Sequence, residues 1–385
     1  MNILLNLSLI SIFFPWVSFG ILQLDTQPWF IILSSAFVFV NIERKLCKPV
    51  CFSLLLFISS VSVGVAYGNF DFLFFRAILS YYSFFIVLCS YYIMRAYYIF
   101  PIKVLIVSNF IWLFSGLLQV VLDKHVLSFL VHVRTTDDRG VTGLAPEPTF
   151  YGIFLFFMSW LLYLERDGIQ KSIFNLLIIL NVVFIVFVAK SSMVILFLMI
   201  SIFLYFVFNI FSIKRILLVS VFLFLSVLFV LNLGYLFEGS RVYKLVMLLQ
   251  DNPLYIISRD ASINERASHV YFSISYFFSD FGYPHGFHAF SQVIDYGRSQ
   301  SNGLFWWGGV DNKIMSGLGG VLFELGWFSL IFIGTVAWFI YSRNNIKYSI
   351  YSIFLFLGIF VSAIPISFSL LPVILVSSHF YFMKK

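Results

Sequence analysis

Charged residues and cysteines are both scarce in this chain. Only 11% of its 385 residues are charged, whereas 61% are hydrophobic and the mean hydropathy is +0.99. Soluble globular domains carry about 25% charged residues, so the composition excludes that class and indicates a polytopic membrane protein. The three cysteines, Cys47, Cys51 and Cys89, are odd in number and lie in or beside apolar segments. They are therefore expected to be packing residues, and they indicate neither a disulfide framework nor a zinc site.

Signatures of nucleotide and nucleic-acid binding are also absent from the sequence. It contains no Gly-rich phosphate loop and no internal repeat, so neither an ATP-driven engine nor a repeat array is expected. The formal net charge is +7, but no soluble basic domain carries it, and nucleic acid is not an expected partner. Neither a metal nor another cofactor is expected. The positive charge instead suits membrane lipids with anionic head groups on one side and an anionic substrate on the other.

Long apolar runs separated by short charged breaks fill most of the chain. A helix of about 20 apolar residues crosses the roughly 30 Å hydrocarbon core of a bilayer. We therefore expect an all-α polytopic membrane protein, a single integral membrane domain over residues 1–385, with about twelve transmembrane helices. The expected spans are 3–22, 28–41, 50–68, 72–93, 103–122, 148–164, 172–189, 192–212, 216–236, 316–341, 347–362 and 366–382.

The distribution of lysine and arginine predicts the orientation of these spans. With a cytoplasmic N-terminus, the cations of the short loops fall on the cytoplasmic side, as the positive-inside rule requires. Both termini are then cytoplasmic, and the first run is expected to be a retained helix because it lacks a cleavage signature. Two long loops, 123–147 and 237–315, lie on the outer side. The outer cations depart from the rule and need another role; they are Lys124, Arg134, Arg139, Arg241, Lys244, Arg259, Arg266, Arg298 and Lys313.

The first outer loop combines a cation, two glycines and the start of a helix. Pro148 suits a first helical turn, so the next span is expected to begin there. Glu147 immediately precedes that helix start. Its carboxylate either has a functional role or only caps the helix. Gly140 and Gly143 give the backbone near Arg139 the freedom to let an anion approach main-chain N–H groups and the guanidinium together.

The second outer loop contains two arginines seven residues apart, Arg259 and Arg266. In one continuous helix they would lie on nearly the same face, where they could clamp a diphosphate. A salt-bridged helix surface that includes Asp260 and Glu265 is the alternative.

A Gly- and aromatic-rich turn follows at residues 281–288. It is a candidate platform for a sugar, and His285 or His288 is a candidate general base. The two histidines lack Cys and neighbouring carboxylate ligands, so a zinc site is not favoured.

Two further ionisable residues stand out within apolar surroundings. Lys190 lies in a tight outer turn between two apolar segments, where it either reaches the head-group region or binds an anion. Glu324 lies inside the predicted span 316–341, where an ionised group is costly and should face protein, water or a partner.

The motif Arg139-Gly140…Gly143…Glu147-Pro148-Thr149…Gly152 resembles the RxxGxxxEPSxxG element of Wzy-type O-antigen polymerases. Further pieces follow in the same order as in that family. Ala189-Lys-Ser-Ser192 is similar to its short Ser-Arg turn, and Phe281-Gly…His285-Gly286-Phe is similar to its Gly-containing loop. Val310-Asp311-Asn312 and Phe323-Glu-Leu-Gly326 are similar to its last loop and helix. The related O-antigen ligases have a His-Asn pair at the Asp311-Asn312 position, so Asp311 favours a polymerase.

The resemblance implies a metal-independent glycosyltransferase in a bacterial inner membrane. Its substrates would be polyprenyl-diphosphate-linked oligosaccharides, and a separate chain-length regulator is a possible partner. By this resemblance Arg139 and Arg266 hold the diphosphate with help from Arg259 and Lys190, His285 contributes to substrate binding, and Asp311 or Glu147 activates the acceptor hydroxyl. An O-antigen ligase, a flippase for lipid-linked oligosaccharides and a secondary transporter are the alternatives.

Overall fold

The computed structural model of the chain describes residues 2–18, 26–68, 70–136, 139–209, 221, 241–308, 313–362 and 364–383. Within these residues every regular element is a helix and there is no strand, which confirms the all-α prediction. Five of the described segments are long and apolar enough to cross a membrane: Lys48–Tyr67, Phe72–Tyr97, Ile102–Val121, Lys171–Ala189 and Gly317–Ile340. The chain therefore has the helices of a membrane protein.

Each predicted span contains a described helix, except 216–236, of which only residue 221 is among the described residues. The helices are α1 (Asn2–Phe13), α2 (Trp29–Val40), α3 (Lys48–Tyr67), α4 (Phe72–Tyr97), α5 (Ile102–Val121), α6 (Pro148–Leu164), α7 (Lys171–Val183), α8 (Ser192–Asn209), α14 (Gly317–Leu325), α15 (Ser329–Ile340), α16 (Ile346–Phe360) and α17 (Leu370–Met383). A π-helical turn, η2 (Phe184–Ala189), extends α7. Short 3₁₀ turns lie at η1 (Arg166–Gly168), η3 (Gly326–Phe328) and η4 (Arg343–Asn345).

Local sequence signals account for several helix boundaries. Helix α3 ends at Gly68, which adopts the left-handed conformation (φ 73°) that glycine accommodates without strain. Helix α4 begins after Asp71, whose carboxylate accepts a hydrogen bond from the Phe74 N–H (2.9 Å). Helix α6 begins at Pro148, as predicted.

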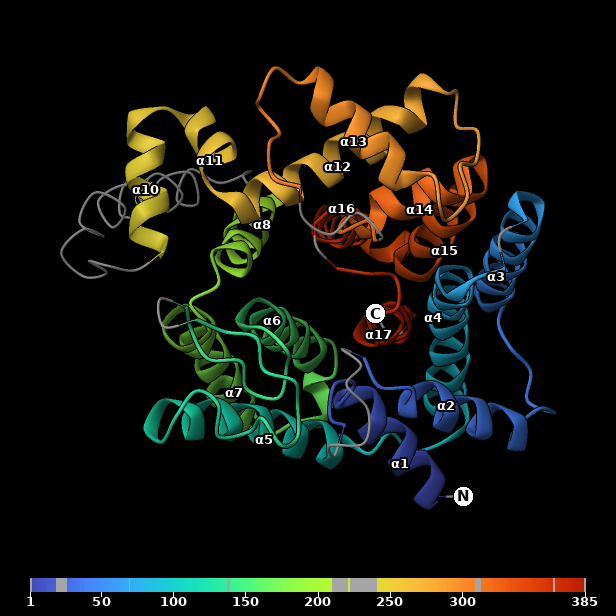
Figure 1. Cartoon of the computed structure of the whole chain (residues 1–385). Coiled ribbons are helices and arrows are strands. Elements are labelled where there is room, and N and C mark those ends of the chain that lie inside the picture. The colour runs from blue at the N-terminus through green and yellow to red at the C-terminus, as the bar shows by residue number, and fades with distance from the viewer. Residues whose placement is uncertain are drawn as a thin grey trace.

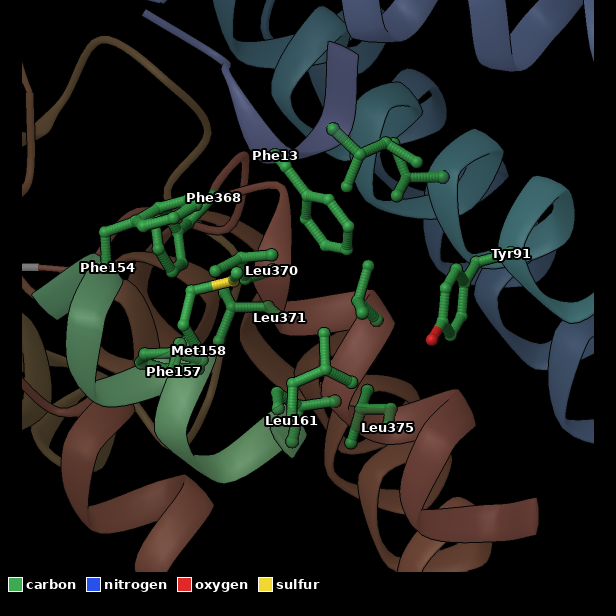
Figure 2. Packing of buried hydrophobic residues seen from close by; sticks show 14 of the residues in the cluster. Phe13, Tyr91, Phe154, Phe157, Met158, Leu161, Phe368, Leu370, Leu371 and Leu375 are labelled. Atoms are coloured by element: carbon green, nitrogen blue, oxygen red, sulfur yellow. The ribbon is translucent and has the colours of Figure 1, made fainter. Parts of the chain in front are cut away.

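The main hydrophobic core lies where α1, α4, α6 and α17 meet. Helix α17 packs against α4 and α6, and in Figure 1 it lies near the centre of the molecule. Figure 2 shows the buried side chains of these elements pointing toward one another, among them Phe13, Tyr91, Phe157 and Leu371. The core also contains paired polar groups, because an unpaired polar group in apolar surroundings is costly. The Tyr91 hydroxyl, for example, is hydrogen-bonded to Ser377 (2.9 Å).

The second predicted outer loop is mostly helical. It contains α10 (Arg241–Asp251), α11 (Pro253–Arg259), α12 (Ala261–Ser279) and α13 (Phe290–Gln300), which lie at the top of the view in Figure 1. These helices have a small core of their own, composed of Phe272, Phe290, Ile294, Phe305, Ile314 and Phe323. Phe323 belongs to α14, so this core attaches the helical segment to the rest of the bundle. The described part of residues 123–147 contains only turns and extended backbone.

The predicted helix over 316–341 is interrupted at Gly326. This glycine has φ 55° and ψ −130°, and η3 separates α14 from α15 there. A Cβ atom at this position would lie 2.3 Å from the carbonyl oxygen of Gly282 and 2.5 Å from the backbone nitrogen of Pro284. The segment between α12 and α13 therefore fills the break, and the predicted span consists of two helices joined by η3.

Candidate substrate-binding site

A cavity of about 210 Å³ lies between the first outer loop, helix α12 and the segments that precede α14 and α17. Four charged residues line it: Arg134, Glu147, Arg266 and Lys313. The rest of the lining includes aromatic side chains, among them Trp16, Phe150 and Phe368. Three cations and one carboxylate beside an apolar wall suit a ligand that carries both negative charge and apolar surface.

Glu147 is the residue immediately before α6, and its side chain faces Arg134. The Glu147 Oε1 lies 3.3 Å from the Arg134 Nη2. The backbone N–H of Arg134 donates a hydrogen bond to the backbone carbonyl of Pro146 (2.7 Å). The carboxylate makes no capping hydrogen bond to the first turn of α6. Glu147 is therefore oriented by an arginine in the cavity wall, and the purely capping alternative does not describe it.

Arg266 reaches the cavity from α12. Its Nη1 group lies 3.7 Å from the sulfur of Met193 in the first turn of α8. Lys313, an exposed residue, lines the cavity from the segment before α14. The structure thus brings Glu147 and Arg266 together, and it adds Arg134 and Lys313, which the sequence analysis noted only as outer cations.

Arg139 and Lys190 do not line this cavity, but their segments touch each other. The Val141 N–H donates to the Val188 carbonyl (3.1 Å), and a Cβ atom on Gly140 would lie 2.2 Å from the Ala189 oxygen. Lys190 adopts the left-handed conformation (φ 48°), which is unusual for a residue with a side chain.

The glycines of the first loop serve close packing. The Gln119 Oε1 accepts hydrogen bonds from the N–H groups of Thr142 (2.9 Å) and Gly143 (2.6 Å). Gly143 has φ 57°, and a Cβ atom there would lie 2.6 Å from the Tyr151 ring. The prediction that this backbone offers its N–H groups to an anion is therefore wrong at Gly143, because Gln119 already occupies that N–H.

Arg259 and Arg266 do not share a helix. Asp260 separates α11 from α12, and its Oδ1 accepts from the Ile263 N–H (2.9 Å) as the cap of α12. Arg259 is exposed and lies over the ring of Tyr255, 4.0 Å from its centroid. The predicted two-arginine clamp on one helix face is wrong.

The turn at 281–288 attaches the outer helices to α14, α3 and α4. His285 Nε2 lies 2.7 Å from Asp280 Oδ2, and the ring stacks on Phe323 with centroids 4.3 Å apart. His288 Nε2 lies 2.9 Å from Asp71 Oδ1. Contrary to expectation, both histidines therefore have neighbouring carboxylates.

Neither histidine lines the cavity, so the structure does not bring His285 to the cavity that Glu147 and Arg266 line. The pKa of Asp71 lies below its ordinary value, because its carboxylate accepts a hydrogen bond from the Phe74 N–H and, as a smaller effect, is hydrogen-bonded to His288.

Among the described residues, no group of three or more His, Cys, Asp or Glu is arranged to hold a metal ion.

Glu324 lies at the break between α14 and α15. The Tyr81 hydroxyl of α4 donates a hydrogen bond to its Oε2 (2.6 Å). Glu324 therefore faces protein, which is one of the surroundings expected from its sequence position.

Arg134 and Lys313 were missed as site residues, although the sequence carried a signal for both. They belong to the predicted outer cations that depart from the positive-inside rule, a signal that they share with the other cations of the two long loops. Asp311, the other candidate base, lies outside the described residues.

Comparison with protein-family models, curated proteins and solved structures finds no match to this chain. Arguments about its function therefore depend on the site and on the motif in the first outer loop.

Proposed function

We propose that this chain is a membrane glycosyltransferase that polymerises polyprenyl-diphosphate-linked oligosaccharide units into a surface polysaccharide. The observation that carries the proposal is the cavity whose wall contains Arg134, Arg266 and Lys313 together with Glu147. A diphosphate is a dense anion, and arginine presents a planar donor fork that matches phosphate oxygens. The apolar part of the wall suits the polyprenyl chain or the face of a sugar ring.

The reaction would transfer the growing chain from its lipid carrier to the next lipid-linked unit. The acceptor hydroxyl attacks the anomeric carbon of the growing chain, and the bond from that carbon to the diphosphate oxygen breaks. Negative charge develops on the departing diphosphate, and cations already in place stabilise it without reorganisation. This role belongs to Arg266, Lys313 and Arg134.

The proton of the acceptor hydroxyl needs a base near the reacting atoms. Among the described residues that line the cavity, Glu147 is the acidic one, and a positioned carboxylate is a common general base. Its ion pair with Arg134 orients the carboxylate. Asp311 is the second candidate, on the basis of the motif resemblance. Arg139 and Lys190 are proposed to assist at the adjoining surface, where their two segments touch.

The proposed location is the inner membrane of a bacterium, with about twelve spans and both termini in the cytoplasm. The cavity then faces the outer side, where lipid-linked oligosaccharides are joined. A chain-length regulator is a proposed partner, and no metal is assigned to the reaction.

Deletion of the gene in its host, followed by separation of the surface polysaccharide by size, tests the proposal. Loss of a polymerase leaves the lipid core with a single repeat unit. Bare core with lipid-linked polymer on the outer leaflet would instead indicate a ligase. Repeat units retained on the inner leaflet would indicate a flippase.

A further inference from the structure

Asn264 is a fully buried amide on α12, and it binds backbone groups of a distant segment. Its Nδ2 donates to the carbonyls of Ile257 (2.8 Å) and Leu304 (2.7 Å). Its Oδ1 accepts from the N–H groups of Trp306 (3.2 Å) and Trp307 (3.0 Å). An amide has two donors and two lone pairs, so all of its hydrogen-bonding capacity is used. Asn264 thus fixes the chain at residues 304–307 against α11 and α12.

His269, on the same helix, binds the chain closer to α14. It is fully buried, and its Nδ1 accepts a hydrogen bond from the Met315 N–H (3.1 Å). An imidazole nitrogen that accepts carries no proton, so the neutral ring has its proton on Nε2. The ring also lies beside Phe290, with centroids 5.1 Å apart. His269 thus fixes the backbone at Met315.

The attachment at Met315 is at the cavity, because Met315 itself lines it. Arg266, which lines the cavity, lies between Asn264 and His269 along α12 and one turn before His269. Lys313, also in the cavity wall, is two residues before the Met315 N–H that His269 binds. The hydrogen bond from Met315 to His269 therefore joins the two segments that bring Arg266 and Lys313 to one cavity.

We propose that His269 is a positioning residue that sets the location of Lys313 relative to Arg266, and so the affinity for the diphosphate. This inference rests on the proposed function. A buried polar side chain needs partners, so a stable core alone would be satisfied by an apolar residue at this position. The structure instead uses His269 to bind the backbone two residues from a cavity cation.

The test compares two substitutions of His269 in the purified full chain. His269→Leu removes the acceptor, whereas His269→Asn keeps a side-chain oxygen near the position of Nδ1. The substrate is the lipid-linked repeat unit isolated from the host. We expect His269→Leu to raise KM about tenfold and to leave kcat within about twofold, and we expect His269→Asn to restore most of the affinity. Ser279→Ala, at the exposed end of α12, is the control and should match the wild type.

A second measurement reports on the surroundings of residue 313 and does not require catalysis. Lys313→Cys is introduced into a chain without its native cysteines, and the rate of labelling by a charged maleimide is measured with His269 and with His269→Leu. We expect a labelling rate that differs at least several-fold between the two chains.

Equal labelling rates with folded protein would overturn the positioning role, and so would a KM that does not respond to His269→Leu. A kcat loss without a KM change would also overturn it. If the wild-type chain fails to polymerise the lipid-linked unit, the proposed function fails by itself. The labelling comparison then still decides whether His269 positions Lys313.

Discussion

Arg259 and Arg266 are close in sequence but lie in different surroundings. Arg266 lines the cavity and reaches Met193, whereas Arg259 lies over Tyr255 at the exposed end of α11. The two residues have the same charge and belong to the same outer helical segment. A comparison of their alanine variants therefore separates a specific role from a general electrostatic one.

We expect Arg266→Ala to lower kcat/KM for polymerisation about 100-fold, because it removes a preorganised cation from the departing diphosphate. Arg259→Ala should stay within about twofold of the wild type, since an exposed cation contributes little at a distance. The measurement is the initial rate with purified protein and lipid-linked repeat unit. Equal losses in both variants would count against the cavity as the diphosphate site.

Glu147 offers a second comparison at the scale of one residue. Glu147→Gln keeps the size of the side chain but removes the proton acceptor and the charge that pairs with Arg134. We expect kcat to fall about 100-fold, the usual contribution of a positioned general base. Glu43→Gln, an exposed carboxylate outside the cavity, is the matched control. Full activity of the Glu147 variant would assign the proton transfer to another group.

Among the helices, the pair α14 and α15 depends most on a contact from elsewhere in the chain. At the break between them, the Trp327 N–H donates to the Gly282 carbonyl (2.8 Å). The N–H groups of His285 and Gly286 in turn donate to the carbonyls of Phe323 and Glu324, both at 3.1 Å. Non-helical backbone within an apolar segment is tolerated where other protein groups satisfy it.

Gly326→Ala should destabilise this element strongly. A side chain there meets backbone atoms of residues 282–284 and must adopt φ 55°, a conformation that costs about 1–3 kcal/mol for residues other than glycine. We expect a clear fall in the midpoint temperature of unfolding in detergent. Gly334→Ala, in α15, is the control, because no atom lies within 4 Å of its added Cβ and alanine favours a helix. A similar midpoint for both variants would contradict the account of the break.

Local sequence signals predicted some elements correctly, and contacts between distant residues account for the errors. The start of α6 at Pro148 was predictable, because proline suits a first helical turn. The division between α11 and α12 at Asp260 also has a local signal, since aspartate is a common helix cap. This cap decides the structure there, although the seven-residue spacing of the arginines suits one continuous helix. The break at Gly326 had no decisive local signal, because the apolar run continues through it and the cause lies at residues 282–284.

The candidate site was predictable only in part for the same reason. Glu147 and Arg266 were singled out by residue type and motif, and both line the cavity. Their convergence with Arg134 and Lys313 involves contacts between residues far apart in the sequence, such as Arg266 with Met193 and His269 with Met315. Such long-range contacts are not encoded in spacing along the chain.

At the scale of the whole molecule, the proposed topology places α13 outside the membrane and the turn between α6 and α7 in the cytoplasm. Ser299→Cys and Asp167→Cys are suitable reporters, because both positions are exposed. In a chain whose native cysteines are replaced by alanine, we expect a membrane-impermeant maleimide to label only the Ser299→Cys variant in spheroplasts. Both variants should be labelled after lysis. Labelling of the Asp167→Cys variant before lysis would reverse the proposed orientation.

The contact between residues 282–286 and the break at Gly326 has a consequence for biogenesis. The ribosome completes α12 and α13 before α14, and the proposed topology requires that these outer helices be exported first. The backbone groups of Phe323, Glu324 and Trp327 can then form their hydrogen bonds with residues 282–286 only after that segment has crossed the membrane. In the proposed topology, insertion of the 317–340 segment would therefore be a templated step, and a chain that cannot export α12 and α13 would leave these backbone groups without their partners.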